Sequence, residues 1–173
     1  SVASDFVGIS GVTALTNGSY VVRSSRLDDG VTVDVGATTW CNGTSGCTGP
    51  VTLANSLLGV TTGDRVGESG VVAFSDGTYA VQSNLFDAAG PIADAGAITF
   101  GDGIAPLAGR VGTTNSVIGT VTNDFTSLAY DPVRKRYLVG RGGSNKVAIV
   151  EVPEPALAPA LAAGLALSGL VRA

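Results

Sequence analysis

The sequence predicts an all-β protein that contains two and a half tandem four-stranded antiparallel units and ends in a short hydrophobic helix. The first observation is a repeat: the stretch from Gly11 to Ser24 returns from Gly70 to Ser83 with seven identical positions. At the centre of the two copies stand Asn-Gly and Asp-Gly, pairs that accept the positive φ of a tight hairpin turn. The chain also holds 25 glycines and only 14% charged residues, against a usual charged fraction of about 25%. Short strands with many turns explain this composition.

Each full unit is expected to contain four strands, because four β-rich runs are separated by Gly-rich turns. In the first unit these runs are 12–16, 19–24, 35–41 and 51–59. The second unit repeats them one period later, and a half unit follows Asp124. The sequence thus predicts one β-repeat domain over 1–152, with units at about 5–63, 64–123 and 124–152.

Residues that recur at one repeat position are expected to serve the structure. The aligned apolar and aromatic sets, expected in the core, are Leu15/Phe74/Tyr130, Tyr20/Tyr79/Tyr137 and Trp40/Phe100. Asp5, Asp64 and Asp124 also share one position, and we expect them to cap a turn or to bridge adjacent units.

The number of strands per unit equals that of a propeller blade, yet a closed propeller needs at least four blades. Two and a half units cannot close alone. They are expected either to pack as an open stack or sandwich, or to be completed by other chains. An open edge strand is a template for pairing with another chain, so the shortfall itself suggests assembly.

The two cysteines, Cys41 and Cys47, are expected to form a disulfide. Asn, Gly, Thr and Ser separate them, which suits a loop that brings the thiols together. A redox-active pair would more typically be Cys-x-x-Cys at a helix start. A structural disulfide indicates an oxidising compartment. The chain contains no Met, so a leader is expected to have been removed from its N-terminus.

Composition limits the chemistry that the chain can perform. It contains no His, which excludes His-dependent triads and His-ligated zinc and leaves carboxylate or Lys chemistry. No nucleophile–base pair is visible, so we expect neither catalysis nor a cofactor. A net charge of -4 disfavours nucleic-acid binding. A calcium site remains an alternative to turn chemistry at the acidic residues Asp28, Asp29, Asp34 and Asp87.

The composition changes after Val152. A Pro-Glu-Pro linker is followed, from Ala156 to Val171, by a run without a single charge. The whole segment 153–173 is expected to be this linker and a membrane helix, although about 17 to 25 apolar residues usually span a bilayer and this run is slightly shorter. Small residues would let a neighbouring helix approach. The residues assigned to the membrane or partner contact are Ala156, Leu157, Leu161, Gly164, Leu165, Ser168, Gly169 and Leu170.

Two parts of the chain resemble known families. Leu128-Ala-Tyr-Asp-Pro, Tyr137-Leu-Val-Gly and the strand to Val152 resemble blades of secreted YVTN-type β-propellers, while Asn17-Gly-Ser-Tyr-Val-Val resembles repeat arrays of bacterial surface proteins. Val152-Pro-Glu-Pro, the Ala/Leu-rich run and Arg172 resemble the C-terminal sorting signal of PEP-CTERM proteins. This resemblance implies export to a Gram-negative envelope, processing by an exosortase and a link to extracellular polysaccharide.

Half of the positive charge lies in one short segment near the end of the repeat domain. These candidates for contact with anionic lipid headgroups or an acidic partner are Arg134, Lys135, Arg136, Arg141 and Lys146. A solvated hairpin tip is the alternative.

The sequence therefore predicts a non-catalytic extracytoplasmic subunit, periplasmic or on the cell surface, with a structural or interaction role. Its C-terminal helix would anchor it to a membrane assembly of other protein subunits, which could include copies of itself. The alternative is a secreted surface or matrix protein that binds carbohydrate or self-assembles through the edges of its β-repeats.

Overall fold

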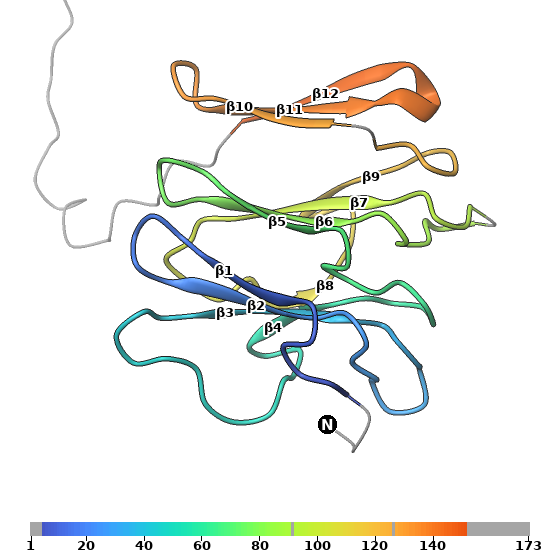
Figure 1. Ribbon diagram of the computed structural model, residues 1–173. Coiled ribbons are helices and arrows are strands. Elements are labelled where there is room, and N and C mark those ends of the chain that lie inside the picture. Colours follow the sequence, from blue (N-terminus) through green and yellow to red (C-terminus); the bar gives the residue numbers. More distant parts are fainter. Residues whose placement is uncertain (1–4, 91, 126, 152–173) are drawn as a thin grey trace, which may run out of the picture.

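The computed structural model describes residues 5–90, 92–125 and 127–151. Within them the chain forms three sheets, coloured along the sequence in Figure 1. The first contains β1 (Gly11–Ala14), β2 (Tyr20–Ser24), β3 (Ala37–Cys41), β4 (Ser56–Leu58) and β8 (Gly109–Arg110). The second contains β5 (Gly70–Ala73), β6 (Tyr79–Ser83), β7 (Ala97–Gly101) and β9 (Ser116–Ile118). The third contains β10 (Ser127–Asp131), β11 (Arg136–Arg141) and β12 (Lys146–Glu151), with the 3-10 turn η1 (Gly142–Ser144).

The prediction of an all-β chain of repeated antiparallel sheets is confirmed. In the first sheet β1–β4 lie side by side in chain order, and in the second sheet so do β5, β6, β7 and β9. Within these two sets every pair of neighbouring strands is antiparallel. The strand β8 departs from the expected division into units. It belongs by sequence to the second unit but pairs in parallel with β4 of the first sheet. The expected C-terminal helix lies outside the described residues.

The hairpin turns form where the Asn-Gly and Asp-Gly pairs predicted them. Gly18 and Gly77 have φ values of +88° and +91°, which a residue without a Cβ adopts at little cost. The side chain preceding each glycine helps to close the turn. Asn17 Oδ1 accepts the Ser19 amide at 3.0 Å, and Asp76 Oδ1 accepts the Thr78 amide at 3.1 Å.

Two strands are shorter than expected because local turns interrupt them. The expected strand 51–59 is reduced to β4, since the Thr52 amide donates to Asn55 Oδ1 at 2.9 Å and the Asn55 amide donates to the Thr52 carbonyl at 3.1 Å. The expected strand 35–41 begins only at Ala37. Asp34 and Gly36 have positive φ values of 51° and 70°, which an extended strand does not accommodate.

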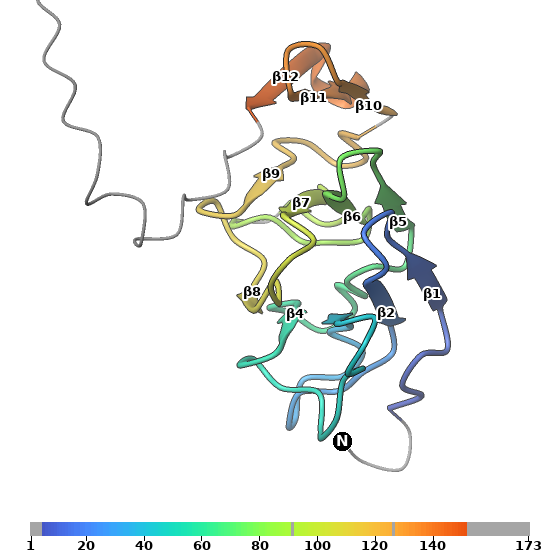
Figure 2. The ribbon, with the colours of Figure 1, turned by 90° about the vertical axis from the view of Figure 1, so that its left-hand side faces the viewer.

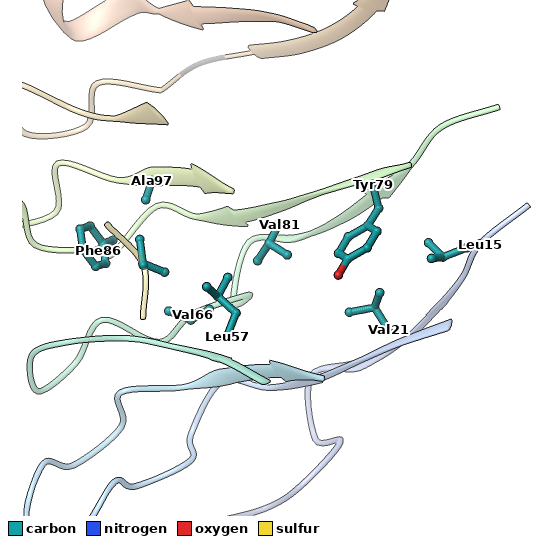
Figure 3. Packing of buried hydrophobic residues seen from close by; sticks show 9 residues of the cluster. Leu15, Val21, Leu57, Val66, Tyr79, Val81, Phe86 and Ala97 are labelled. Atoms are coloured by element: carbon teal, nitrogen blue, oxygen red, sulfur yellow. The ribbon is translucent and has the colours of Figure 1, made fainter. Parts of the chain in front are cut away.

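The three sheets stack face to face as layers (Figures 1 and 2). Because alternate residues of a strand point to opposite faces, each sheet can contact two neighbours. Side chains of Leu15, Val21 and Leu57 meet Tyr79 and Val81 between the first and second sheets (Figure 3). Between the second and third sheets the buried residues are Phe74, Ala80, Ile98, Tyr137 and Val139.

The repeated aromatic residues lie in or beside these layers, although to different degrees. Tyr79 and Tyr137 are buried, with 1% of each residue exposed, whereas Tyr20 is half-buried. Trp40 and Phe100 are also half-buried and pack against the first and the second inter-sheet core, respectively. In these two sets the expectation of a core position is therefore fully met at Tyr79 and Tyr137. In the third set it is met at Leu15 and Phe74, which are both buried.

One predicted equivalence is wrong by a single residue. Tyr137 pairs with Tyr130, as Tyr79 pairs with Ala73, so Tyr130 is equivalent to Ala73 and not to Phe74. Asp131 takes the position that Phe74 has in the second unit. The cause is the β10–β11 pairing, which extends by one residue pair to Asp131 and Arg136 before a longer turn.

Of the recurring aspartates, which were expected to cap a turn or to bridge adjacent units, Asp64 and Asp124 bridge successive units. Asp64 is fully buried, and its Oδ2 accepts the amides of Val60 and Thr61 at 2.6 and 2.7 Å, in the loop that ends the first unit. Its Oδ1 accepts the amide of Asp87, in the second unit, at 3.0 Å. Asp5 makes the equivalent of the contact between Asp64 and Asp87, since its Oδ1 accepts the Asp28 amide at 3.2 Å.

Asp124 does the same between the second and third units. Its Oδ2 accepts the Thr120 amide at 2.9 Å and pairs with the Arg141 guanidinium at 2.6 Å, and its Oδ1 accepts the Ser144 amide at 2.9 Å. Each of the first two units is thus attached to the next by one buried carboxylate that satisfies backbone amides on both sides.

Candidate functional site

The acidic residues considered for calcium form loop contacts and ion pairs within the protein. Asp28 Oδ1 accepts the Asp34 amide at 2.8 Å, and Asp87 Oδ1 accepts the equivalent Asp94 amide at 2.9 Å. Asp34 also pairs with Arg65 at 3.1 Å, and Asp29 pairs with Arg110. Across residues 5–90, 92–125 and 127–151 no group of three or more acidic, Cys or His residues could hold a metal ion. The structure supports the turn-chemistry alternative.

A groove lies where the end of the first unit meets the second. Its volume is about 460 Å³, and most of its lining is apolar. Asp87 supplies the carboxylate in its wall, and that side chain is already used to hold the Asp94 amide. The remaining lining residues are Val60, Thr61, Phe86, Ala88, Ala89, Gly90, Val111, Gly112, Thr113 and Ile118. The lining thus contains neither His nor Lys and offers no pair of groups for nucleophilic attack or for general acid–base catalysis.

The pKa shifts of the described residues move groups away from neutrality. Burial raises the pKa of Asp124, but hydrogen bonds from Ser144 and Thr120 and the Arg141 guanidinium outweigh it and hold that pKa at about 2. The hydrogen bond that Tyr130 donates to Asp76 raises the pKa of Tyr130 to about 12. Both contacts join the second unit to the third. A general acid or base needs a pKa that is shifted towards neutrality. The pKa values of Asp124 and Tyr130 are shifted the other way, so these groups are suited to holding the sheets together.

The predicted disulfide between Cys41 and Cys47 is confirmed, with Cα atoms 4.9 Å apart. Cys41 ends β3 and is buried, and the loop that follows is folded by Asn42. The side-chain oxygen of Asn42 accepts hydrogen bonds from the backbone amides of Thr44 and Ser45 at 2.8 and 3.1 Å. The backbone carbonyl of Asn42 accepts the Gly46 amide at 2.8 Å. The second unit has no such bond, because Gly101 occupies the position of Cys41 and lies beneath the Tyr79 ring.

Replacing Cys41 and Cys47 together by Ser is expected to lower the free energy of unfolding by about 2 kcal/mol. The two cysteines are only six positions apart, and closing so small a loop restricts the unfolded chain only modestly. Urea unfolding of the double variant and of the unreduced parent would measure the difference. An equal decrease for the Thr44→Ala variant, which keeps the disulfide, would assign the effect to the loop and not to the covalent bond.

The five basic residues do not form one cluster. Arg134, Lys135 and Arg136 lie at the turn between β10 and β11, whereas Arg141 and Lys146 lie at the opposite end of β11. Arg134 and Arg136 pair with Asp131 at 3.3 and 3.4 Å. The Arg141 side chain is only 13% exposed and pairs with buried Asp124. A headgroup contact would therefore involve the β10–β11 turn or the Lys146 end separately.

The sequence did not reveal which backbone groups connect the first two sheets. The carbonyl of Gly103 accepts both the Asn17 side-chain amide at 2.7 Å and the Trp40 indole N–H at 2.9 Å. The recurrence of Gly43 and Gly103 one period apart was a signal for a required backbone approach, but it did not identify the partners. The predicted tail contacts, from Ala156 to Leu170, lie outside the described residues. In the part of the chain that the structure describes, no helix has the length and hydropathy to cross a membrane.

Comparison with known sequences agrees with the repeat seen in the structure. Residues 14–68 and 73–127 each match a family described as a repeat of unknown function (DUF5650). The second match begins one period after the first, and together the two cover more than half of the chain. Neither the curated proteins nor the solved structures contain a significant match. The chain therefore belongs to the DUF5650 repeat family.

Proposed function

We propose that the protein is a non-catalytic, extracytoplasmic structural or interaction subunit, anchored to a membrane assembly by its C-terminal segment. The observation that carries this proposal is the joining of a disulfide-closed β-repeat domain to the uncharged run from Ala156 to Val171. The disulfide favours an oxidising compartment. The groove without catalytic groups and the pKa shifts away from neutrality favour a structural role over an enzymatic one.

The tail motif supports a more specific placement in a Gram-negative-type envelope. Val152-Pro-Glu-Pro followed by an Ala/Leu-rich run is similar to the PEP-CTERM sorting signal. A helix over 156–171 would be about 24 Å long, which is short for a hydrocarbon core of about 30 Å. Such a span is best tolerated against a neighbouring helix. Gly164, Ser168 and Gly169 would form the side that this neighbour approaches.

Ending the chain at Pro155 is expected to move the protein from the membrane fraction to the soluble fraction, because the uncharged run is lost. Replacing Gly164 and Gly169 by Leu should leave the protein in the membrane but reduce its recovery with other subunits about tenfold, since bulky side chains prevent close helix packing. Membrane fractionation and copurification in mild detergent would measure both effects.

The matched control for the glycine variants replaces Ala163 by Leu, because this alanine would lie on the side of a helix away from Gly164, Ser168 and Gly169. That variant should retain both membrane attachment and partners. If the chain ending at Pro155 stays membrane-bound, the β-repeat domain provides the attachment and the anchoring proposal is wrong. Glycan binding by the chain without the tail would favour the carbohydrate-binding alternative.

A further inference from the structure

The outer face of the first sheet exposes repeat positions that are buried in the second sheet. Val66 is completely buried against the first sheet, but its equivalent Val7, one period earlier, is 56% exposed. In each sheet we call one of the two faces the near face. It is the face that carries the repeated tyrosine, together with every second residue of the same strand. On the near face of the first sheet Val12 pairs with Val22, as Val71 pairs with Val81 in the second.

In the first two strands of a sheet, the exposure of the near-face residues depends on whether another sheet lies opposite. In the first sheet the near-face residues Ala37 of β3 and Leu58 of β4 are already buried beside Leu27 of the same chain. Val81 is 0% exposed and Tyr79 is 1% exposed, because the first sheet covers them. Their equivalents Val22 and Tyr20 are half-buried, and Val12 is 61% exposed. The short segment before β1 adds further apolar surface, with Phe6 56% and Ile9 55% exposed.

The outer face of the third sheet has the complementary feature. In every sheet we call the face opposite the near face the far face, so the far face lies away from the repeated tyrosine. Ile149 pairs with Leu138, as Phe100 pairs with Ala80 in the second sheet, and Val147 occupies the position of Ile98. Ile98 is 1% exposed under the third sheet, whereas Val147 and Ile149 are 67% and 56% exposed.

The two interfaces inside the chain show which faces fit together. The far face of the first sheet, with Val21 and Leu57, packs on the near face of the second, with Tyr79 and Val81. The far face of the second sheet, with Ala80, packs in turn on the near face of the third. The β1–β2 part of the first sheet's near face and the far face of the third sheet have no other sheet against them, at opposite ends of the described stack (Figure 1).

We propose that a second copy of this chain covers these faces, so that the far face of the third sheet in one copy packs against the near face of the first sheet in the next. A second copy is the partner that the faces favour, because it continues an interface that the chain already makes twice. At one end of the far face Arg136 is held in an ion pair with Asp131 at 3.4 Å. Such a head-to-tail contact joins two different surfaces and therefore produces rings or filaments. It goes beyond the anchoring proposed above, since it concerns the sheet faces and not the tail.

The test blocks one face at a time in the full-length chain, studied in mild detergent by sedimentation velocity. Val12→Lys blocks the near face, and Ile149→Lys blocks the far face. Both side chains are more than half exposed, so the folded chain should accept the change. The controls are Val31→Lys and Val133→Lys, because these valines are 98% and 87% exposed and lie in turns outside the strands that form the two faces.

The parent chain and both controls are expected to form assemblies that grow with concentration. Each blocked variant alone should be monomeric, with association weakened about 30-fold or more by an unpaired ammonium group in an apolar contact. Mixing the two blocked variants in equal amounts should restore a dimer, because each supplies the intact face that the other lacks.

Several results would overturn the proposal. A parent chain that stays monomeric at every concentration would show that no second copy covers the faces. Association of the Ile149→Lys variant by itself would indicate a contact between two near faces, and a failure of the mixture to dimerise would exclude the head-to-tail contact. The Gly164→Leu/Gly169→Leu variant should still assemble through its sheets, which separates this inference from the tail-anchoring proposal.

Discussion

Truncating Tyr137 to Ala is expected to lower the free energy of unfolding by about 3–5 kcal/mol. This side chain joins the third sheet to the second and is only 1% exposed. Its ring stacks on Phe100 with centroids 4.3 Å apart and also contacts Phe74 at 4.9 Å. Its hydroxyl donates to Thr78 Oγ1 at 2.6 Å. The truncation therefore removes both an aromatic contact and a buried hydrogen bond.

The loss should be concentrated in the third sheet, because that sheet contacts the rest of the stack through this cluster. Hydrogen exchange should show faster exchange of amides in β10–β12 while β1–β4 remain protected. The control Tyr137→Phe keeps the ring and loses only the hydroxyl, which should cost about 1 kcal/mol. If exchange increases equally in all three sheets, the sheets unfold as one unit and this assignment fails.

Replacing Asp124 by Ala is expected to cost about 3–5 kcal/mol, since it removes one partner of a buried ion pair. The Arg141 guanidinium and the amides of Thr120 and Ser144 would lose their shared acceptor. Denaturant unfolding would measure the change. The matched control is Asp102→Ala, because Asp102 is exposed and accepts the amides of Ile104 and Ala105 within its own turn. The control should lose no more than about 1 kcal/mol.

The pH dependence provides a second check on Asp124. Its folded pKa of about 2 is below the ordinary value of 3.8, so the folded state binds this proton less readily than the unfolded state does. The stabilisation is therefore complete above about pH 4 and is lost as the pH falls towards about 2. The Asp124→Ala variant should lack this part of the acid-induced loss, whereas the Asp102→Ala control should retain it. Equal pH profiles for parent and Asp124→Ala would contradict the role assigned to the carboxylate.

The hairpins and the repeat could be predicted because their signals are local. A glycine after Asn17 or Asp76 specifies a turn by its own backbone freedom, and alternating apolar residues then specify a strand on each side. The bridging role of Asp64 and Asp124 was also predictable, because a charged residue repeated among apolar strands needs partners. The disulfide followed from a short polar loop between two thiols.

What the sequence did not reveal depends on contacts between distant residues. The acceptor role of the Gly103 carbonyl depends on how the first two sheets face one another, and no local pattern encodes that. Tyr130 was assigned one position out of register, because a longer turn moves the point where the hairpin closes. The parallel pairing of β8 with β4 joins segments that are far apart in the sequence and has no signal in either of them.

The bridging aspartates have a consequence for how such a chain can change in evolution. Asp5, Asp64 and Asp124 follow one another at the period of the repeat, and the latter two accept amides both from the loop before them and from the unit after them. A gene duplication or deletion of one whole period would therefore leave each such carboxylate with donors on both sides. Insertion of a partial period would instead bury a carboxylate or amide without its partner. Arrays of these repeats should thus lengthen and shorten in whole periods, and relatives should differ in repeat number more readily than in repeat length.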